Sequence, residues 1–296
     1  MKKILVTGAY GQLGNELRVL SSGMPEQDFY FTDYDSLDIT DSFAVGDYIG
    51  SVRPDFVIQC AAYTGVDKAE QDRELCFRLN AMAPGIMAAA CGKFSARLVH
   101  ISTDYVFDGT SGVPYTEDHP ANPQGVYGLS KRAGELACLE NPESVIIRTS
   151  WLYSSFGQNF VKTMIRLGRE RDHLNVVYDQ VGTPTYARDL ASVILTIISQ
   201  TISDSGIWTP GIYHYSNEGV CSWYDFALAI HELSGIICSV NPVETKDFFT
   251  LAKRPGYSVL NKSKIKSTYN LTIPYWLESL KKCIEIIKSS KEYGNQ

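Results

Sequence analysis

Hydrophobic and polar positions follow two alternating patterns along the chain. Short apolar runs rich in branched residues are typical of buried strands and occur at 3–7, 29–33, 54–60, 97–101, 144–149 and 211–215. Segments with an apolar residue every three or four positions separate these runs and predict helices at 41–51, 66–92, 127–139, 159–171, 186–199, 222–233 and 273–287. Strands that alternate with helices predict an α/β fold with a doubly wound parallel sheet.

The turn after the first strand carries a glycine pattern, Gly-xx-Gly-xx-Gly, between a strand and a helix. The middle glycine lets the backbone approach a pyrophosphate, whose charge the helix N-terminus attracts. An ordinary glycine turn is the alternative, and the flanking strand and helix disfavour it. The sheet is therefore expected to be of Rossmann type and to bind a dinucleotide. The candidate cofactor-binding residues of the turn are Gly8, Tyr10, Gly11, Gln12, Leu13 and Gly14.

An acid at the end of the second strand bears on the choice of cofactor. Asp33 lies about 20 residues beyond the glycine turn, where an acid commonly meets a ribose 2′-hydroxyl. No arginine lies in the turn or directly after Asp33, which favours NADH over NADPH. Asp38, beside Ile39, either caps the following helix or accepts a hydrogen bond from the adenine amino group.

The end of the third strand supplies further candidates for the cofactor site. Ala61 and Ala62 are small and leave room for a cofactor that crosses the top of the sheet, and Tyr63 follows them. Asn80 lies inside a helical pattern, where asparagine is mildly unfavourable. It is either a surface residue or a buried one that ties the helix to the site.

A tyrosine and a lysine four residues apart carry the candidate chemistry. Tyr127 and Lys131 project from the same face of a predicted helix. An ammonium beside a phenol favours the phenolate, so we expect Lys131 to lower the pKa of Tyr127. Such a phenol can donate a proton to a carbonyl oxygen or take one from an alcohol. Ser102 and Thr103 end a strand at the same edge of the sheet. The spacing alone also fits a surface lysine near an unrelated aromatic residue, and the glycine turn disfavours that interpretation.

Composition and charge exclude several classes of protein. The 296 residues are 44% hydrophobic and 20% charged, with a net charge of −6, which argues against a nucleic-acid or anionic-membrane partner. The seven cysteines form no CxxC motif, so we expect reduced thiols in a cytoplasmic protein. The histidines show no metal-ligand spacing, the first apolar run belongs to a strand rather than a signal peptide, and no apolar run is long enough for a membrane span.

The glycine turn, Ser102-Thr103 and the Tyr127/Lys131 pair resemble the extended short-chain dehydrogenase/reductase superfamily, over nearly the whole chain. More narrowly, the chain resembles the dTDP-4-dehydrorhamnose reductase family. The specific runs are Ser-Thr-Asp-Tyr-Val-Phe at 102–107 and Arg-Thr-Ser-Trp at 148–151. Further matching runs lie at 11–14, 61–70, 159–160, 179–180, 182–184 and 254–255.

The resemblance implies an activity, the reduction of the 4-keto group of dTDP-4-dehydro-6-deoxy-L-mannose to dTDP-L-rhamnose for cell-surface polysaccharide synthesis. NADH or NADPH would donate the hydride. Thr103 would position the keto oxygen, Tyr127 would protonate it and Lys131 would hold the nicotinamide ribose. The implied substrate-binding residues are Thr64, Val66, Thr103, Asp104, Tyr105, Trp151, Asn159, Gln180 and Arg254. Trp151 is alternatively a core residue, and Arg254 a surface arginine.

Two domains are expected. Residues 1–150 and about 173–214 would form the dinucleotide-binding domain. A basic amphipathic helix begins after residue 150, and about 151–172 together with 215–296 would form a smaller, discontinuous α+β substrate lobe. Some members of the resembled family hold a magnesium ion between glutamates at a dimer contact. Glu16 matches one such position, but Arg188-Asp189 replaces the expected acids, so we predict no metal. A homodimer stays open.

Other functions are known for the same scaffold as the reductase. A 4,6-dehydratase needs Asp-Glu directly after the threonine, and this chain has Asp104-Tyr105. A 3,5-epimerase-reductase needs a cysteine and a histidine in the pocket, and Cys60 is the one cysteine near a predicted strand end. Two alternatives stay open: a reductase for another 4-keto-6-deoxy nucleotide sugar, and a non-catalytic dinucleotide-binding regulatory subunit.

Overall fold

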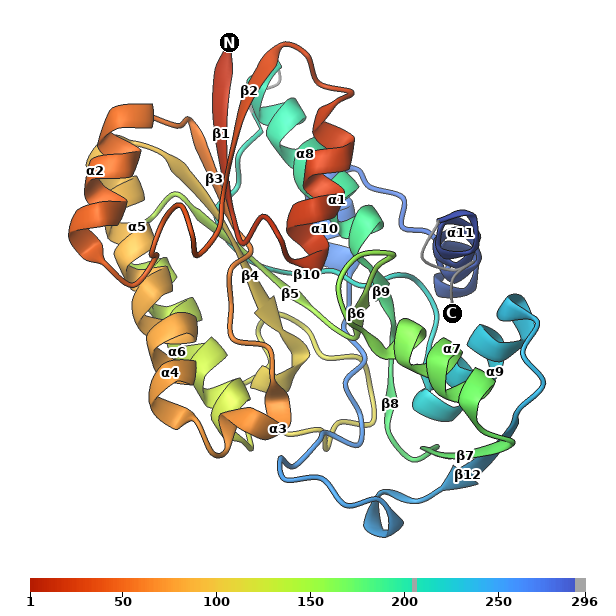
Figure 1. The fold of residues 1–296 in the computed structure, drawn as a ribbon. Helices are drawn as coiled ribbons and strands as arrows, with labels where there is room; N and C mark the ends of the chain where they lie inside the picture. The colour runs from red at the N-terminus through yellow and green to blue at the C-terminus, as the bar shows by residue number, and fades with distance from the viewer. Residues whose placement is uncertain (204–206, 291–296) are drawn as a thin grey trace.

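A six-stranded parallel sheet forms the centre of the computed structural model, which describes residues 1–203 and 207–290 (Figure 1). Its strand order is β10-β5-β4-β3-β1-β2. The strands are β1 (Lys2–Thr7), β2 (Gln27–Thr32), β3 (Phe56–Gln59), β4 (Arg97–Thr103), β5 (Ser144–Thr149) and β10 (Gly211–His214). The predicted doubly wound α/β fold is confirmed. Residues 204–206 and 291–296, which fall in the ranges predicted for the two domains, lie outside the described residues.

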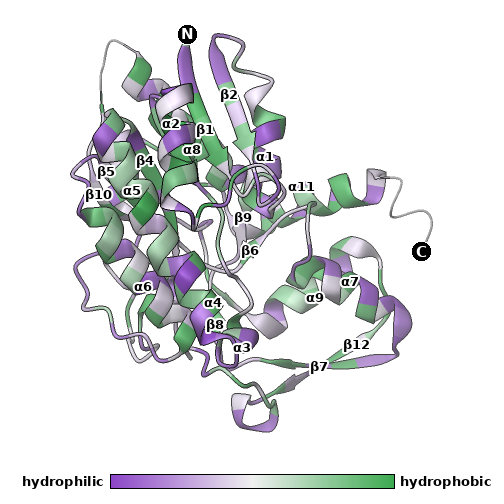
Figure 2. Cartoon of the chain, turned by 60° about the vertical axis from the view of Figure 1, so that its left-hand side comes forward, coloured by the Kyte–Doolittle hydropathy of each residue, from purple (hydrophilic) through white to green (hydrophobic). Residues whose placement is uncertain are grey.

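The inner strands of the sheet are buried on both faces, whereas the edge strand β2 is mostly half-buried. In β1, Ile4 and Val6 belong to the core beneath α1 (Gln12–Ser21) and α8 (Ala187–Ile202). Leu5 belongs to the core on the opposite face, beneath α2 (Ser42–Val52), α5 (Ala83–Phe94) and α6 (Val126–Leu139). Side chains alternate along a strand, so a parallel sheet with helices on both faces needs continuous apolar runs. Figure 2 shows this change along β1, from hydrophilic at the N-terminus to hydrophobic inside the sheet.

The chain reverses direction across the sheet between β1 and β3. From β1 it moves outward to β2, and it then returns to place β3 on the other side of β1. Ligands of open α/β sheets bind beyond the carboxyl ends of the strands at such a reversal. Thr7 and Gln59 are paired there at the ends of β1 and β3.

The segment 66–92, predicted as one helix, consists of four helical pieces. These are α3 (Val66–Ala69), α4 (Arg73–Phe77), the π-helical turn η1 (Arg78–Met82) and α5. A single π-helical turn inside an α-helix often occurs at a functional site. Asn80 lies in this turn.

The stretch Arg73–Phe94 has the length and hydropathy of a membrane span, by length and composition only. From the sequence, no apolar run was expected to be long enough for a membrane span. In the structure Ala83, Met87 and Cys91 from this stretch are fully buried against the central sheet. The core helix of a globular domain meets the same criteria of length and composition.

A second core lies beside the sheet, next to its carboxyl ends. It is built from α7 (Phe160–Glu170), α9 (Trp223–Ser234), α11 (Trp276–Ser289) and the parallel pair β7 (His173–Val177) and β12 (Ser239–Val243). The helix α9, predicted at 222–233, begins at a serine cap: Ser222 accepts from the Asp225 N–H, and Asp225 accepts from the Ser222 N–H. Two short strand pairs join this region to the sheet: β6 (Leu152–Tyr153) with β9 (Thr185–Tyr186), and β8 (Val181–Gly182) with β11 (Cys221–Ser222).

The predicted division into two domains stays a prediction, and two elements pack away from the range given to them. β7 lies within 173–214 but packs in the second core through Leu174 and Val176. The helix α10 (Ser263–Tyr269) lies within 215–296, yet Ile265 and Tyr269 pack in the core of the central sheet. Neither α10 nor β12 was predicted from the sequence. β12 is poorly marked because it contains Asn241 and Pro242, which disfavour strands.

Two helical glycines make a matched stability test. A Cβ on Gly134, in α6, would lie 2.0 Å from the Asn80 carbonyl oxygen, so η1 and α6 pack backbone against backbone. We expect Gly134→Ala to lower the free energy of unfolding by about 1–3 kcal/mol, the usual effect of overpacking. A Cβ on Gly46, in α2, meets nothing within 4 Å. Gly46→Ala should therefore raise stability by about 0.5–1 kcal/mol through its higher helix propensity. Thermal unfolding of both variants is the measurement, and equal melting temperatures would contradict the packing argument.

Candidate active site

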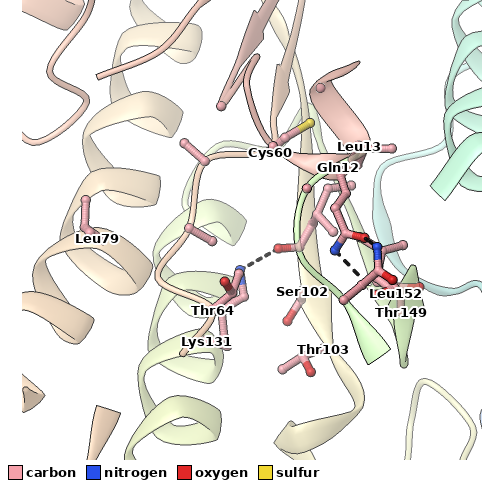
Figure 3. A pocket seen from close by; sticks show the side chains of 18 of the residues that line it. Gln12, Leu13, Cys60, Thr64, Leu79, Ser102, Thr103, Lys131, Thr149 and Leu152 are labelled. Carbon is pink, nitrogen blue, oxygen red and sulfur yellow. Dashed lines mark hydrogen bonds between the residues drawn. The ribbon is translucent and has the colours of Figure 1, made fainter. Parts of the chain in front are cut away.

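A cavity of about 910 Å³ lies at the carboxyl ends of the central strands. Thr7, Cys60, Thr103 and Thr149, from the ends of β1, β3, β4 and β5, line it on the side of the sheet. Figure 3 shows Ser102 and Thr103 on β4 and Lys131 on α6, with Gln12 and Leu152 together on another side of the cavity. Residues of α7 and α9 complete the wall, so both cores contribute to it.

Most of the predicted site residues come together in this cavity. Those that line it are Gly8, Tyr10, Gly11, Gln12, Leu13, Gly14, Asp33, Asp38, Ile39, Ala61, Ala62, Thr64, Val66, Thr103, Asp104, Tyr105, Tyr127, Lys131, Trp151, Asn159 and Arg254. Three predicted residues do not line it: Tyr63, Asn80 and Gln180. The roles given to all of these residues stay predictions, and the geometry around each bears on them.

Close backbone packing explains why the turn after β1 needs glycine. Gly8 has a φ of +68°, and a Cβ there would lie 2.6 Å from the Ala61 nitrogen. A Cβ on Gly14 would lie 2.3 Å from the Gly8 carbonyl oxygen. Gly11 caps α1 without a side-chain hydrogen bond, so the first N–H groups of that helix are available to an anion. These N–H groups border the cavity through Gln12 and Leu13.

The rim of the cavity beside β2 is acidic. Asp33 accepts from the Tyr10 N–H at 2.7 Å and from the Tyr34 N–H at 2.8 Å, so its carboxylate is fixed. Asp38 accepts from the N–H and the hydroxyl of Thr40, and these hydrogen bonds lower the pKa of Asp38. The N-cap of α2 is Asp41, so the proposed capping role of Asp38 is wrong. Carboxylates here disfavour a 2′-phosphate on the cofactor.

Asn80 is buried and holds the backbone behind the cavity. Its side chain accepts from the Tyr63 N–H at 2.8 Å and donates to the Tyr63 carbonyl at 2.9 Å and to Ser130 Oγ at 3.1 Å. Of the two alternatives from the sequence, the surface residue is wrong and the buried tie is confirmed. Asn80 therefore holds the segment after β3 in place, and the cofactor contacts predicted for Tyr63 and Asn80 stay predictions.

The candidate catalytic residues lie on adjacent elements. Tyr127 is in the first turn of α6, with Lys131 one turn later, and Thr103 ends β4. Lys131 Nζ donates to the Ile101 carbonyl at 2.6 Å. Thr103 Oγ1 donates to Asp104 Oδ1 at 3.0 Å and accepts from the Tyr105 N–H at 3.2 Å. This arrangement fixes all three side chains at one part of the cavity wall.

The expectation that Lys131 lowers the pKa of Tyr127 is wrong. Burial raises the pKa of Tyr127 well above its ordinary value, and a hydrogen bond with Thr103 opposes this only in part. Burial also lowers the pKa of Lys131 to about 8, and its ammonium donates to Ile101 rather than to the phenol. Tyr127 is therefore protonated at neutral pH, the state that an acid needs in order to donate to a carbonyl oxygen.

Arg254 reaches the cavity from a segment without helix or strand. Its Nη2 donates to Asp67 Oδ2 at 2.6 Å and its Nη1 donates to the Tyr105 hydroxyl at 3.2 Å. Asp67 also accepts from the Ala252 N–H at 3.1 Å, so it holds the whole segment. Arg254 is therefore a fixed side chain, and the surface-arginine alternative is wrong. Asp67 was not proposed as a site residue, although it lies in the run 61–70 that carries the family resemblance.

Trp151 both lines the cavity and packs in the protein. Its ring stacks on Trp223 with centroids 3.6 Å apart, and its backbone has a φ of +47°. A Cβ on Gly182 would lie 2.7 Å from the Trp151 ring, so close packing surrounds it. The ring therefore packs beside the second core, as the core alternative predicts, but it also lines the cavity, and its contact with a substrate ring stays a prediction. Trp223 also lines the cavity and was missed, because it begins a helix of the second core far along the chain.

Two further predicted residues hold loops. Asn159 caps α7 by accepting from the Lys162 N–H at 3.1 Å, and it donates to Gln12 Oε1 at 3.0 Å. It thereby joins the glycine turn to the second core. Gln180 is buried and donates to Thr245 Oγ1 at 3.1 Å, away from the cavity lining. Residues that line the cavity but were not proposed include Leu37, Leu79, Ser150, Gln158 and Phe160.

Both a cation and an acid lie near Glu16. Glu16 is buried and accepts from Ser154 Oγ at 2.6 Å. Burial raises its pKa, the hydrogen bond from Ser154 and the positive charge of Arg188 lower it, and the negative charge of Asp189 raises it. The absence of a metal stays a prediction. The part of the chain that the structure describes, 1–203 and 207–290, contains no cluster of three or more potential metal ligands.

Comparison with known proteins places the chain. A family model described as RmlD substrate binding domain matches residues 1–289. The chain belongs to this family. A dTDP-4-dehydrorhamnose reductase of Aggregatibacter actinomycetemcomitans is 40% identical over 288 residues, which cover 95% of this chain and 98% of that protein. The predicted resemblance to the reductases of this family is confirmed.

Solved structures agree with this assignment. A crystal structure of a dTDP-4-dehydrorhamnose reductase from Clostridium acetobutylicum is 44% identical, with a TM-score of 0.91 and coverage of 97% of this chain and 99% of that one. A dTDP-4-dehydrorhamnose reductase from Bacillus anthracis in complex with NADP is 41% identical, with a TM-score of 0.91 and coverage of 97% and 100%.

The low pKa of Lys131 predicts that kcat/KM for the cofactor depends on pH. Its ammonium is present at low pH and is lost as the pH rises through about 8. If the ammonium binds the cofactor ribose, kcat/KM for the cofactor should fall as the pH rises through that value, because kcat/KM reports groups of the free enzyme. Lys131→Arg keeps its charge at all these pH values, so its residual activity should lack this decline. A wild-type profile that stays flat well above that pH would contradict the role given to Lys131.

Proposed function

We propose that this protein is an NAD(P)H-dependent reductase of a nucleotide sugar. It reduces the 4-keto group of dTDP-4-dehydro-6-deoxy-L-mannose, and the product is dTDP-L-rhamnose for cell-surface polysaccharide synthesis. One observation carries the proposal: Thr103, Tyr127 and Lys131 line the same cavity as the glycine turn after β1. The reductases described above, of similar length and fold, support the choice of substrate.

The residues of the cavity suit a reduction. When bound, the reduced nicotinamide supplies the hydride. Tyr127, protonated at neutral pH because burial raises its pKa, donates a proton to the keto oxygen as negative charge develops there. Thr103 lies beside Asp104 and Tyr127 and positions that oxygen. Lys131 holds the ribose of the cofactor through its ammonium.

The glycine turn indicates where the cofactor binds, but the residues around it distinguish NADH from NADPH less clearly. The N–H groups at the start of α1 would hold the pyrophosphate. Asp33 and Asp38 on the rim favour NADH, whereas the Bacillus anthracis relative was crystallised with NADP. We therefore assign NADH or NADPH, with NADH preferred.

The substrate would occupy the part of the cavity between β4 and the second core. Thr64, Val66, Asp104 and Tyr105 would contact the sugar. Arg254 would bind the diphosphate, because its planar guanidinium can pair with phosphate oxygens while Asp67 and Tyr105 hold it. Among the lining residues Lys131 and Arg254 are the cations, and Lys131 is engaged at the catalytic end.

The geometry disfavours two alternatives. For a 4,6-dehydratase, the position after Asp104 holds Tyr105, whose hydroxyl is bound by Arg254 and cannot replace a carboxylate base. For a 3,5-epimerase-reductase, Cys60 lines the cavity, but burial raises its pKa far above neutrality and the lining includes no histidine of the described residues. The intact catalytic residues argue against a purely regulatory subunit. A reductase for another 4-keto-6-deoxy nucleotide sugar is separated from this proposal by identification of the product.

The expected setting of the protein stays a prediction. All seven cysteines are free thiols in the structure, and the cytoplasmic location, the absence of nucleic-acid and membrane partners and a homodimer rest on the sequence alone.

The decisive test combines substrate and variant. The protein is supplied with dTDP-4-dehydro-6-deoxy-L-mannose and NADH or NADPH, the nicotinamide absorbance is followed, and the product sugar is identified. Tyr127→Phe should lower kcat by at least about a hundredfold while cofactor affinity stays nearly unchanged, because only the proton donor is removed. Tyr178→Phe, on an exposed tyrosine outside the cavity, is the matched control. Activity of Tyr127→Phe within about threefold of wild type would remove the phenol from the mechanism.

A second variant tests how the protein distinguishes NADH from NADPH. Asp33→Ala removes a fixed carboxylate from the rim, so the ratio of kcat/KM for NADH to kcat/KM for NADPH should fall by about tenfold, the effect of one lost charge-assisted hydrogen bond. Asp47→Ala, on the exposed face of α2, should leave the ratio unchanged. An unaltered ratio in Asp33→Ala would show that the ribose is read by other residues.

A further inference from the structure

One turn of α6 beyond Lys131, a fully buried carboxylate joins three elements of the central domain. Glu135 Oε1 accepts from Ser102 Oγ at 2.6 Å and from Arg148 Nε at 2.8 Å. Glu135 Oε2 accepts from Arg148 Nη2 at 2.9 Å and from Arg132 Nη1 at 2.7 Å. The side chain of Glu135 is 0% exposed, and that of Arg148 is 2% exposed. The proposed function makes no use of this pair.

The Arg148 guanidinium is held on its other sides as well. Its Nη1 lies 3.4 Å from His214 Nε2 on β10, and its Cζ lies 5.1 Å from the centre of the Phe107 ring. A buried ion pair stabilises a fold weakly at best, because both charges lose their hydration. Its two-pronged geometry does fix the relative positions of the elements that carry it. Such a pair is therefore better suited to specifying a geometry than to adding stability.

Two of the three elements held by Glu135, α6 and β4, carry the candidate catalytic residues, and the third, β5, carries Thr149 of the cavity lining. Ser102 and Arg148 are opposite each other in the pairing of β4 with β5. The next pair toward the cavity is Thr103 and Thr149, and both line it. From the helix that bears Tyr127 and Lys131, Glu135 thus binds β4 at Ser102, which itself lines the cavity, and β5 at Arg148, one residue before the lining Thr149.

We propose that Glu135 is a positioning residue for the reaction: through Ser102 and Arg148 it fixes α6 against β4 and β5, so that Tyr127 and Lys131 stay beside Thr103 in the cavity wall. Glu135 touches neither the cavity nor the reacting atoms, since it does not line the cavity. It acts through Ser102, which is covalently adjacent to Thr103, and through its own helix. The expected effect on the reaction rests on the proposed function. The contacts that hold α6 against β4 and β5 do not depend on it.

Glu135 has a second effect, on the charge of Lys131. The groups that face this ammonium are Cys138 and Glu135 from α6, Cys76 from α4 and Cys60 from the end of β3, with His100 from β4. Burial raises the pKa of each of the three thiols and lowers that of His100, so these groups are neutral near pH 7. Burial alone would raise the pKa of Glu135, but Arg148, Ser102 and Arg132 hold it below its ordinary value. Among these groups Glu135 therefore carries the negative charge that supports the ammonium.

The smallest test removes the Ser102 hydroxyl, which binds Glu135 and also lines the cavity. Ser102→Ala keeps the Glu135–Arg148 pair but loses the hydrogen bond that ties α6 to β4. We expect kcat to fall by about tenfold, because displacement of catalytic groups by a fraction of an ångström has effects of this size, while KM for the nucleotide sugar changes by less than about twofold. An unchanged kcat in Ser102→Ala would overturn the positioning role.

The charge is tested separately, without any need for turnover. In protein labelled with ¹³C at the lysine Cε, the NMR signal of Lys131 is assigned through Lys131→Arg and followed as a function of pH. In Glu135→Gln this signal should titrate at lower pH than in wild type. Glu140→Gln, an exposed acid at the end of the same helix, should leave the titration unchanged. An identical Lys131 titration in wild type and Glu135→Gln would refute the electrostatic part.

A double variant separates positioning from stability. Glu135→Met with Arg148→Met replaces both charges by apolar side chains of similar size, which often leaves stability unchanged or improved. The melting temperature should recover relative to Glu135→Gln, but kcat should stay at least about tenfold below wild type. Recovery of both melting temperature and kcat would show that Glu135 only stabilises the fold. If wild type does not reduce the 4-keto sugar, the proposed function fails, whereas the Lys131 titration still decides whether Glu135 controls that ammonium.

Discussion

Parallel pairing of the six strands of the central sheet is the constraint on which the rest of this structure depends. In a parallel sheet all carboxyl ends lie at one edge, so residues far apart in sequence, such as Thr7, Thr103 and Thr149, meet there. The apolar runs of the inner strands are buried on both faces, and several buried polar residues among them have partners, as Gln59 has in His100 and Arg148 in Glu135. The polar groups that line the cavity come from the carboxyl ends of the strands and from the turns after them.

Burial determines the properties of the candidate catalytic groups. It keeps the Tyr127 phenol protonated and brings the pKa of Lys131 down to about 8. A buried ammonium has few compensating partners, and here these are the Ile101 carbonyl and the negative charge of Glu135. The same burial that weakens the lysine as a cation makes each remaining charge near it count more, because the local dielectric constant is low.

The second core completes the cavity through side chains rather than through sheet pairing. Asn159 binds Gln12 of the glycine turn, and Trp151 stacks on Trp223. Arg254 crosses from the irregular segment to Asp67 and Tyr105. These contacts place groups from both cores around one volume, which is what an enzyme needs to hold a cofactor and a sugar face to face.

The sequence by itself determined the strands, most of the helices and the identity of the cavity-lining turns, because apolar periodicity and glycine spacing are local properties. It identified Tyr127, Lys131, Thr103 and the glycine turn for the same reason, together with their resemblance to a known family. It could not place Tyr63, Asn80 and Gln180 behind the lining, or reveal Asp67, Trp223 and Glu135, because their positions depend on partners far away in the chain. The sign of the shift in the pKa of Tyr127 was also decided by tertiary structure alone. The helix fixes the spacing between the Tyr127 phenol and the Lys131 ammonium. Only the packed protein decides which oxygen the ammonium binds and how much water each group loses.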